Sequence, residues 1–338
     1  MKTIVCNSPN HFLVTEREMP AVKEGEALVK IHRIGICGTD IHAYHGRQPF
    51  FSYPRVLGHE LSGEIAELNG ENHDFSIGEK VAIIPYLECG ECIACRKGKP
   101  NCCRNIQVLG VHTDGGMQEY ISVPISHLIK INPLTYDQAA LVECLSIGAH
   151  AVRRAGIQKD EFVLVIGAGP IGLGIMQYVR LAGAKVIAMD MSEERLEFCQ
   201  KWASPDYTVN AKENPESAIE EITNGDYPTV VFDATGNINS MNNAFKYTAH
   251  GGSLIYVGLV QADLQFPDQE FHKRELTMFA SRNATKEDFE TVIKSVEEGK
   301  IDVQPFITSN VPLDSLPERF EELTAPGTGN IKIMVELS

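Results

Sequence analysis

The sequence predicts an α/β protein in which a doubly wound parallel sheet is joined to a second, β-rich domain. Three observations predict this fold. From about residue 160 onward, short apolar runs alternate with helical stretches, which indicates a parallel sheet covered on both faces. A glycine-rich turn, Gly167–Gly172, follows the first of these runs. Before it, short β-type runs are punctuated by Gly and Pro and contain a tight cluster of cysteines.

The elements follow from apolar periodicity and turn residues. In the β-rich part we expect strands at Ala27–Ile31, Glu64–Leu68, Lys80–Ile84 and Gln118–Val123. Later strands are expected at Phe162–Ile166, Lys185–Met189, Tyr207–Asn210, Thr229–Phe232, Ser253–Val257 and Leu276–Ala280. Helices are expected at Pro170–Ala182, at Ser192–Trp202 with a Ser cap, and near 214–223, 238–248 and 285–299.

Composition excludes several classes of protein. The chain has 338 residues and a net charge of −15, which argues against general binding of nucleic acid or of anionic membranes. The uncharged run from Phe162 to Val179 is interrupted by glycines and Pro170, so we expect no membrane span. Nine cysteines without a recognisable signal peptide favour metal ligands over disulfides, and a cytoplasmic location.

The glycine-rich turn predicts a dinucleotide site. Gly167-Ala168-Gly169-Pro170-Ile171-Gly172 is a G-x-G-x-x-G pattern that follows an apolar strand and opens a helix. Gly167 permits the tight turn, Gly169 lets the backbone approach a pyrophosphate, and Gly172 lets helix and strand pack closely. A glycine turn that binds nothing, or that binds FAD or another nucleotide, stays open as an alternative.

An acidic residue ends the next strand. Asp190 lies 18 residues after Gly172, where a carboxylate accepts hydrogen bonds from ribose hydroxyls and repels a 2′-phosphate. We therefore expect NAD rather than NADP. Arg195 could contact a phosphate or stack on adenine, so tolerance of NADP stays open.

Four closely spaced cysteines predict a structural metal. Cys89, Cys92 and Cys95 are followed by Cys103, and such thiolates suit a tetrahedral zinc with no open position. Spacing alone does not decide between Cys102 and Cys103. Reduced free thiols, a redox cluster or an iron–sulfur cluster are the alternatives.

A second set of ligand types is more dispersed. Cys37 begins CGTDIH, His59 and Glu60 lie in GHE, and Glu143 lies in VECLS. One Cys, one His and a carboxylate can hold zinc and leave a coordination position for water or substrate.

Taken in order, CGTDIH, GHE, the cysteine cluster, ECLSIGAHA, GAGPIG and Asp190 make the chain resemble the zinc-dependent medium-chain dehydrogenase/reductase family, in its sorbitol and threonine dehydrogenase branch. The resemblance covers essentially the whole chain and implies two zinc ions, one catalytic and one structural, with NAD. It also implies a homodimer or homotetramer. Cys144 stands where the family usually has a proline.

The resemblance also implies residue roles. Cys37, His59 and Glu60 would bind catalytic zinc, with Glu143 beside the metal or its water. Thr39 and His42 would relay a proton, and the family's spacing selects Cys103 for the structural site. Cofactor contacts would come from Gly167, Gly169, Ile171, Gly172, Asp190, Arg195, Val257, Gly258, Leu259, Ser281 and Arg282.

The resemblance assigns the two domains. Residues 1–147 and 298–338 would form a GroES-like catalytic domain that carries the zinc sites, because the Pro- and β-rich tail is expected to rejoin the first domain. Residues 148–297 would form a Rossmann NAD-binding domain.

Longer segments, including LGVHTDGG and FHKRELTMFASRNAT, resemble bacterial sugar-acid dehydrogenases of this family. The expected substrate is therefore a small sugar acid or polyol. Arg47, Arg282 and His112 are candidates to contact a substrate carboxylate, and Phe50–Tyr53 a candidate pocket wall. L-Threonine oxidation is an alternative, and a non-catalytic NAD-binding regulator is an alternative of a different class.

Overall fold

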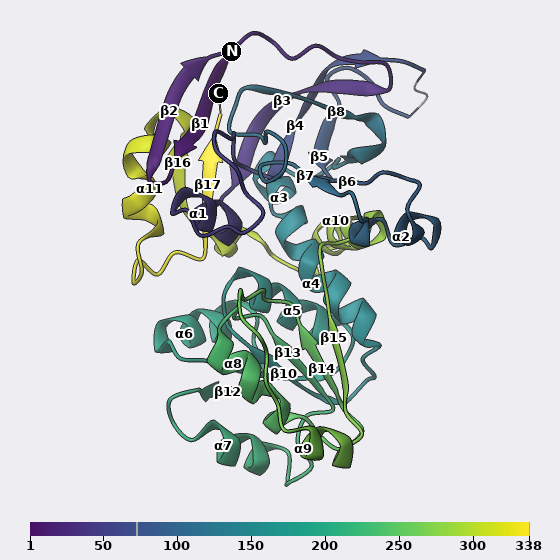
Figure 1. Cartoon of the computed structure of the whole chain (residues 1–338), viewed down its shortest axis with the longest axis vertical. Helices are drawn as coiled ribbons and strands as arrows, with labels where there is room; N and C mark the ends of the chain where they lie inside the picture. The colour runs from purple at the N-terminus through teal and green to yellow at the C-terminus, as the bar shows by residue number, and fades with distance from the viewer. Residues whose placement is uncertain (72–73, 338) are drawn as a thin grey trace. The chain divides into compact units, whose positions relative to one another are not determined.

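A computed structural model describes residues 1–71 and 74–337 of the chain (Figure 1). The chain divides into two compact units. Unit 1 comprises Met1–Cys144 and Thr285–Ser338, and unit 2 comprises Leu145–Ala284.

Unit 1 is built on a seven-stranded sheet in the order β16-β17-β3-β4-β5-β9, with β8 also paired to β3. Its central strand is β3, whose Val29, Ile31 and Ile34 are buried in the core. Strands β3 and β4 are antiparallel, and their register places Gly35 opposite Glu60. This pairing brings the end of β3 beside the start of β4, where two of the expected metal-binding motifs lie.

The strands of unit 1 are β1 (Lys2–Ser8), β2 (His11–Glu16), β3 (Glu26–Gly35), β4 (Glu60–Asn69), β5 (Lys80–Ile83), β6 (Tyr86–Leu87), β7 (Gln107–Val108), β8 (Tyr120–Pro124), β9 (Leu128–Lys130), β16 (Ile307–Pro312) and β17 (Lys332–Glu336). Its helices are α1 (Gly38–Tyr44), α2 (Ile93–Arg96), α3 (Tyr136–Ala140), α10 (Lys286–Glu297) and α11 (Leu316–Thr324). Helix α4 (Val142–Ala155) begins in unit 1 and continues in unit 2.

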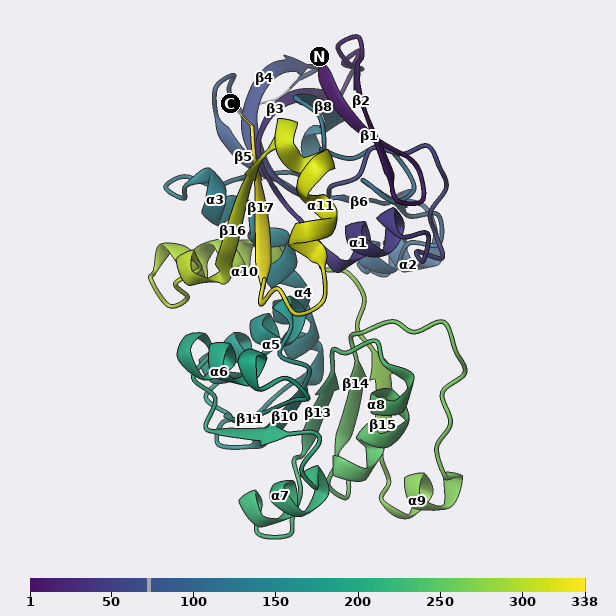
Figure 2. The same ribbon diagram turned by 90° about the vertical axis from the view of Figure 1, so that its left-hand side faces the viewer.

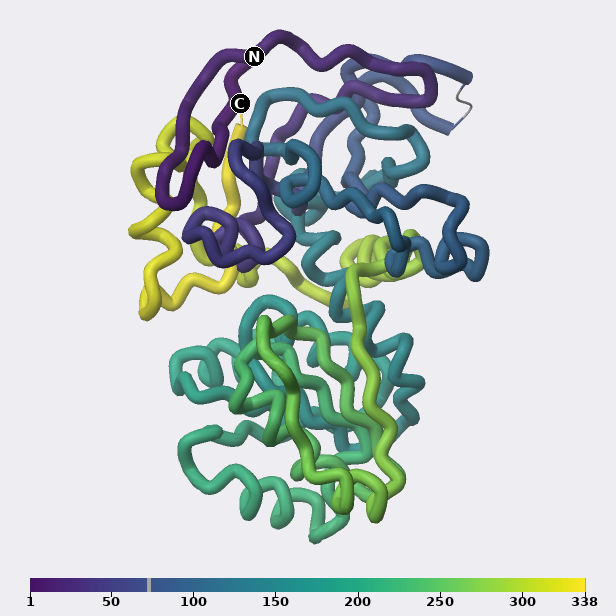
Figure 3. The backbone as a smooth tube through the Cα atoms, in the orientation of Figure 1, coloured from purple at the N-terminus to yellow at the C-terminus, as the bar shows by residue number. Residues whose placement is uncertain are grey.

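The last segment of the chain packs with the first. Strand β17 runs parallel to β16 and antiparallel to β3, with Met334 opposite Gly35. Figure 2 shows β16, β17 and α11, in yellow, beside the strands that open the chain. In the backbone tube of Figure 3 the yellow C-terminal and purple N-terminal segments are again adjacent. The rings of Phe12 on β2 and Phe320 on α11 meet edge to face at 5.1 Å. The sheet of unit 1 is thus completed by residues distant in sequence.

Unit 2 contains a six-stranded parallel sheet in the order β12-β11-β10-β13-β14-β15. Leu164 and Ile166 of β10 face a cluster that includes Ile219 of helix α7. Val165 faces the other side, where Gly172 of helix α5 approaches it. Side chains on both faces are therefore covered, as expected for a doubly wound sheet. The predicted α/β fold class is confirmed.

The strands of unit 2 are β10 (Phe162–Ile166), β11 (Lys185–Asp190), β12 (Tyr207–Asn210), β13 (Val230–Asp233), β14 (Ser253–Tyr256) and β15 (Thr277–Ala280). Its helices are α5 (Pro170–Leu181), α6 (Glu193–Trp202), α7 (Pro215–Ile222), α8 (Ile238–Asn243) and α9 (Asp268–Lys273). The Ser192 hydroxyl accepts a hydrogen bond from the Arg195 N–H at 3.4 Å, which is the cap expected for α6.

Helix α10 belongs to unit 1, although the sequence analysis counted residues up to 297 with the second domain. Its Phe289 is fully buried and lies edge-on to the ring of Tyr86. A helical pattern predicts an apolar face but not the partner that covers it, so the unit to which α10 belongs follows from this contact.

The apolar run that begins at Phe162 divides into β10, the glycine turn and most of α5. Among residues 1–71 and 74–337, no helix has both the length and the apolar character needed to cross a membrane.

Candidate functional site

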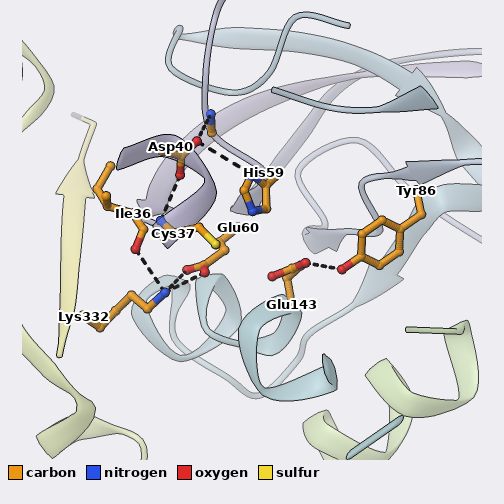
Figure 4. A network of polar contacts seen from close by, with 9 residues as sticks. Ile36, Cys37, Asp40, His59, Glu60, Tyr86, Glu143 and Lys332 are labelled. Carbon is orange, nitrogen blue, oxygen red and sulfur yellow. Dashed lines mark hydrogen bonds and ion pairs between the residues drawn. The ribbon is translucent and has the colours of Figure 1, made fainter. Parts of the chain in front are cut away.

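Three of the predicted metal ligands converge in unit 1. Cys37 precedes α1, His59 directly precedes β4, and Glu60 is the first residue of β4. One potential ligand atom from each residue lies within 4.8 Å of the other two. Gly35 leaves room for the Glu60 side chain, because a Cβ atom at position 35 would lie 2.0 Å from Glu60 Oε2 and would displace the carboxylate. The pairing of β3 with β4 therefore places a thiol, an imidazole and a carboxylate around one point (Figure 4).

The buried carboxylate of Asp40 connects the segment that carries Cys37 to the segment that carries His59. Its carboxylate accepts hydrogen bonds from the backbone N–H groups of Cys37, at 2.9 Å, and Gly58, at 3.1 Å. Its Oδ1 also lies 3.8 Å from His59 Nδ1. Burial raises the pKa of Asp40. Burial alone would lower the pKa of His59, but the charge of Asp40 raises it well above its ordinary value. Asp40 is not among the residues predicted from the sequence, although its place three residues after Cys37 was an available signal.

Glu60 is paired with a buried lysine that the sequence analysis also missed. Lys332 Nζ lies 2.6 Å from both carboxylate oxygens of Glu60 and donates to the Ile36 carbonyl at 3.2 Å. Both side chains are almost completely buried. Burial alone would lower the pKa of Lys332, but neighbouring thiols and the Glu60 carboxylate raise it. No local pattern links residues separated by 272 positions.

Glu143 behaves differently from the other predicted ligands. It lies in the first turn of α4, and its carboxylate accepts a hydrogen bond from the Tyr86 hydroxyl. Among the described residues, the group of converging donors contains Cys37, His59 and Glu60 but not Glu143. Figure 4 shows Glu143 turned toward Tyr86.

The three converging residues fit a zinc ion with an open position. Thiolate, imidazole and carboxylate are all zinc ligands, and three protein ligands are typical of catalytic zinc. His59 and Glu60 are buried, and His59 Nδ1 makes no hydrogen bond within 3.5 Å. The donor set therefore matches the chemistry expected for this site.

The four-cysteine lobe also fits zinc. The sulfur atoms of Cys89, Cys92, Cys95 and Cys103 lie within 4.8 Å of one another, with Cys103 Sγ 3.4 Å from Cys89 Sγ and 3.9 Å from Cys92 Sγ. Tetrahedral Zn–S bonds of about 2.3 Å require sulfur separations of roughly 3.8 Å. Backbone N–H groups also approach the sulfurs, and they lower the pKa of Cys92 to about 6. Cys102 is exposed and outside the group, so the geometry selects Cys103.

The expected proton relay lies on α1. Thr39 and His42 are three residues apart on this helix, which places them on neighbouring turns of one face. Burial, together with the charges of Arg47 and His45, lowers the pKa of His42.

The aromatic run after α1 divides in the structure. Phe51 packs against Tyr53, whose hydroxyl donates to the Ala43 carbonyl. Phe50 instead remains exposed and stacks near the ring of His112, at 6.4 Å between centroids. The predicted pocket wall, residues 50–53, therefore stays a prediction, with Phe50 as its most exposed ring.

In unit 2 the glycine turn has the geometry of a dinucleotide loop. Gly167 has φ = +100°, and a Cβ atom on Gly172 would lie 1.7 Å from the Gly167 carbonyl oxygen. A Cβ on Gly169 would lie 3.1 Å from the Arg195 guanidinium. Asp190 Oδ2 accepts a hydrogen bond from the Ala168 N–H at 2.7 Å, which ties the expected ribose contact to the turn.

The other predicted cofactor residues lie after neighbouring strands. Ile171 is in the first turn of α5, Val257–Leu259 follow β14, and Ser281 and Arg282 follow β15. The backbone of Gly258 approaches Gly236 so closely that a Cβ on Gly258 would lie 2.4 Å from the Gly236 nitrogen. The Ser281 hydroxyl is buried and makes no hydrogen bond.

The loop after β13, whose Thr235 packs on Gly167, is not among the sites predicted from the sequence. The pattern DATG directly after a predicted strand was an available signal, because ligands bind at the carboxyl ends of such strands. The loops fit a dinucleotide in backbone geometry and in the free hydroxyl they offer.

Comparisons with known proteins agree with this geometry. Residues 23–133 match the family model of the alcohol dehydrogenase GroES-like domain, and residues 170–298 match that of the zinc-binding dehydrogenases. The chain is 45% identical to L-galactonate-5-dehydrogenase of Escherichia coli K12 over 95% of this chain and 94% of the relative. It is 36% identical to the starvation-sensing protein RspB of the same strain, over 91% of each chain.

A solved structure gives the same result. The alcohol dehydrogenase RspB from E. coli CFT073, complexed with the cofactor NADH, superposes with a TM-score of 0.93 at 32% identity, covering 100% of this chain and 99% of that one. The predicted GroES-like domain and the predicted zinc-dependent enzyme are confirmed. Since both models match in order along one chain and the relatives cover almost all of it, the chain belongs to the zinc-dependent medium-chain dehydrogenase/reductase family.

Proposed function

We propose that this dehydrogenase oxidises a secondary alcohol of a sugar acid with NAD, and that its substrate is L-galactonate, which yields D-tagaturonate. The observation that carries the proposal is the set of three converging donors, Cys37, His59 and Glu60, on a chain that also carries a dinucleotide loop. The 45% identity to L-galactonate-5-dehydrogenase supports the choice of substrate. NADH bound to RspB, and Asp190 at the end of β11, support NAD.

The proposed reaction removes a hydride from carbon and a proton from the hydroxyl of the same alcohol. Zinc held by Cys37, His59 and Glu60 would supply a Lewis acid that makes the hydroxyl more acidic. NAD would accept the hydride and become NADH. Glu143 lies beside these ligands rather than among them, which leaves a coordination position for the alcohol.

The chain's own groups then have to move the proton. In our proposal the Thr39 hydroxyl accepts it from the substrate while donating its own toward His42. Because the pKa of His42 is lowered, its imidazole is neutral and able to accept a proton at neutral pH. His42 is only partly buried, and its exposed part can release the proton to water.

Substrate recognition would involve charge and stacking. His112 Nδ1 accepts a hydrogen bond from the Val108 N–H at 3.1 Å, and in our proposal Nε2 is the nitrogen that contacts a substrate hydroxyl or carboxylate. Phe50 beside it offers an apolar face to the sugar carbons. Arg47 and Arg282 are the proposed carboxylate contacts, each within a few residues of another proposed site residue.

The test is a panel of sugar acids, polyols and L-threonine, assayed with NAD and NADP by the absorbance of the reduced cofactor. L-Galactonate should give the highest kcat/KM, and Arg47→Ala or Arg282→Ala should raise its KM while changing that of an uncharged polyol much less. A polyol or threonine as the best substrate would replace the proposed specificity. Binding of NAD without oxidation of any alcohol would favour a regulator.

We also propose a homodimer or homotetramer in the cytoplasm. The resemblance to the family supports the assembly, and nine cysteines without a disulfide support a reducing compartment. Sedimentation would test the assembly.

A further inference from the structure

The reaction proposed above assigns no role to Tyr86, the buried partner of Glu143. Tyr86 is 4% exposed and Glu143 is 5% exposed, and the phenol hydroxyl donates directly to Glu143 Oε1. Glu143 neighbours Cys144 in sequence, and in the view of Figure 4 it is drawn between Tyr86 and the group formed by Cys37, His59 and Glu60. A carboxylate this close to a metal-binding group, yet outside it, requires something that holds it away.

Tyr86 is itself held firmly. Strand β6 pairs with β7, which places Tyr86 opposite Val108. The Tyr86 carbonyl oxygen lies 3.2 Å from His127 Nε2. Its ring meets that of Phe289 edge-on, with centroids 6.3 Å apart. The backbone and the ring of Tyr86 therefore have contacts of their own, independent of the contact between its hydroxyl and Glu143.

The two carboxylates near the metal-binding group have different partners. Glu60 is paired with the ammonium group of Lys332 and still lies within the converging donors. Glu143 is bound by a neutral phenol and, in the part of the chain that is described, does not join them. A fourth protein ligand would give a closed zinc site, which is typical of structural rather than catalytic zinc.

We propose that Tyr86 is a positioning residue that keeps Glu143 off the metal and so keeps one coordination position open to the substrate. The inference rests on the proposed function to the extent that the open position serves an alcohol. What is proposed is which protein atoms coordinate the metal, and this can be measured without turnover.

The test uses the full chain with Co²⁺ in the Cys37 site, because cobalt reports its coordination in the visible spectrum. Tyr86→Phe removes the hydroxyl and keeps the ring against Phe289. The variant should release cobalt to 1,10-phenanthroline more slowly, because Glu143 would then add a fourth protein ligand. We expect a change of at least about tenfold, although loss of a residue around metal ligands ordinarily weakens metal binding, by roughly 10–100-fold. Added imidazole should shift the parent spectrum and leave that of Tyr86→Phe unchanged. The release phase of this site is the one that Cys37→Ser abolishes.

Two controls separate the proposal from a general loosening of the core. The double variant Tyr86→Phe/Glu143→Gln should regain the imidazole response and the release rate of Glu143→Gln alone. Tyr136→Phe removes another phenol–carboxylate contact of unit 1, to Glu64 at 3.2 Å, and should leave the cobalt spectrum unchanged.

The proposal is overturned if Tyr86→Phe keeps the parent's release rate and imidazole response, if its changes persist in the double variant, or if Tyr136→Phe reproduces them. None of these readouts depends on a sugar acid. Failure to oxidise L-galactonate would therefore reject the proposed substrate and leave the role of Tyr86 standing, and normal oxidation with an unchanged cobalt site would do the reverse.

Discussion

Lys332 and Glu60 form a buried ion pair in which one ammonium nitrogen lies 2.6 Å from both carboxylate oxygens. The pair joins β17 to the start of β4 at the metal-binding group. Burying two charges is costly, so the pair contributes mainly by fixing the position of Glu60, and removing one partner leaves an uncompensated charge.

Lys332→Met should therefore lower the free energy of unfolding by about 3–5 kcal/mol, the cost of leaving one member of a buried pair alone. Urea denaturation of the purified protein measures this change. The double variant Lys332→Met/Glu60→Gln removes both charges and should lose less stability than the single variant. Equal losses in the two variants would mean that the charge on Glu60 is not what Lys332 compensates.

Cys95→Ser should reduce the zinc content from two ions per chain to one, because the lobe loses one of its four converging thiols. Elemental analysis measures the zinc, and thermal unfolding should occur at a lower temperature. Cys102→Ser is the matched control, since Cys102 is exposed and outside the group, and it should retain both ions. Loss of zinc from Cys102→Ser would contradict the assignment.

Thr39→Val should lower kcat by about a hundredfold, within the range that general acid–base groups contribute, and leave metal content unchanged. The measurement is steady-state oxidation of the best substrate, with elemental analysis of the same sample. Thr39→Ser keeps the hydroxyl and should retain most of the activity. Normal turnover in Thr39→Val would exclude the relay.

The midpoint of His42 titration should lie below the usual value for histidine, because burial and the positive charges of Arg47 and His45 lower its pKa. The neutral, proton-accepting imidazole therefore persists to lower pH and is lost only as the pH falls through that midpoint. NMR of the His42 ring against pH measures the midpoint. Arg47→Gln should raise it, whereas Arg47→Lys keeps the charge and should not; an identical midpoint in all three proteins would refute the stated cause.

Asp190→Asn should weaken NAD binding about tenfold or more, because a hydrogen bond to a charged acceptor contributes roughly 1.5–3 kcal/mol. Discrimination against NADP should fall as well, since the negative charge is removed. Fluorescence titration with each cofactor measures both effects. Asp206→Asn is a suitable control, because Asp206 accepts a hydrogen bond from the Val186 N–H at 2.8 Å outside the glycine turn. Unchanged NAD affinity in Asp190→Asn would rule out its assigned role.

The sequence predicted features that depend on local pattern. The strands and helices around Gly167 and the cap at Ser192 follow from apolar period and turn chemistry, and all appear in the structure. The four thiols of the lobe lie within 15 residues, so their convergence also followed from spacing.

Contacts between distant segments could not be predicted in the same way. Lys332 gives no local sign that it binds Glu60, and Tyr86, the first residue of β6, gives no sign that it binds Glu143. Helix α4 also went unpredicted, because Gly148 weakens the helical pattern. That glycine allows close packing, since a Cβ there would lie 2.7 Å from the backbone of Gly174.

The separation of 272 residues between Glu60 and Lys332 has a consequence for biosynthesis. Cys37, His59 and Glu60 leave the ribosome long before β17 does, so during translation the nascent chain exposes a set of ligands whose lysine counter-ion does not yet exist. A metal ion bound at that stage would contact a Glu60 carboxylate that Lys332 does not yet fix in place. Correct assembly of the metal site would therefore follow translation.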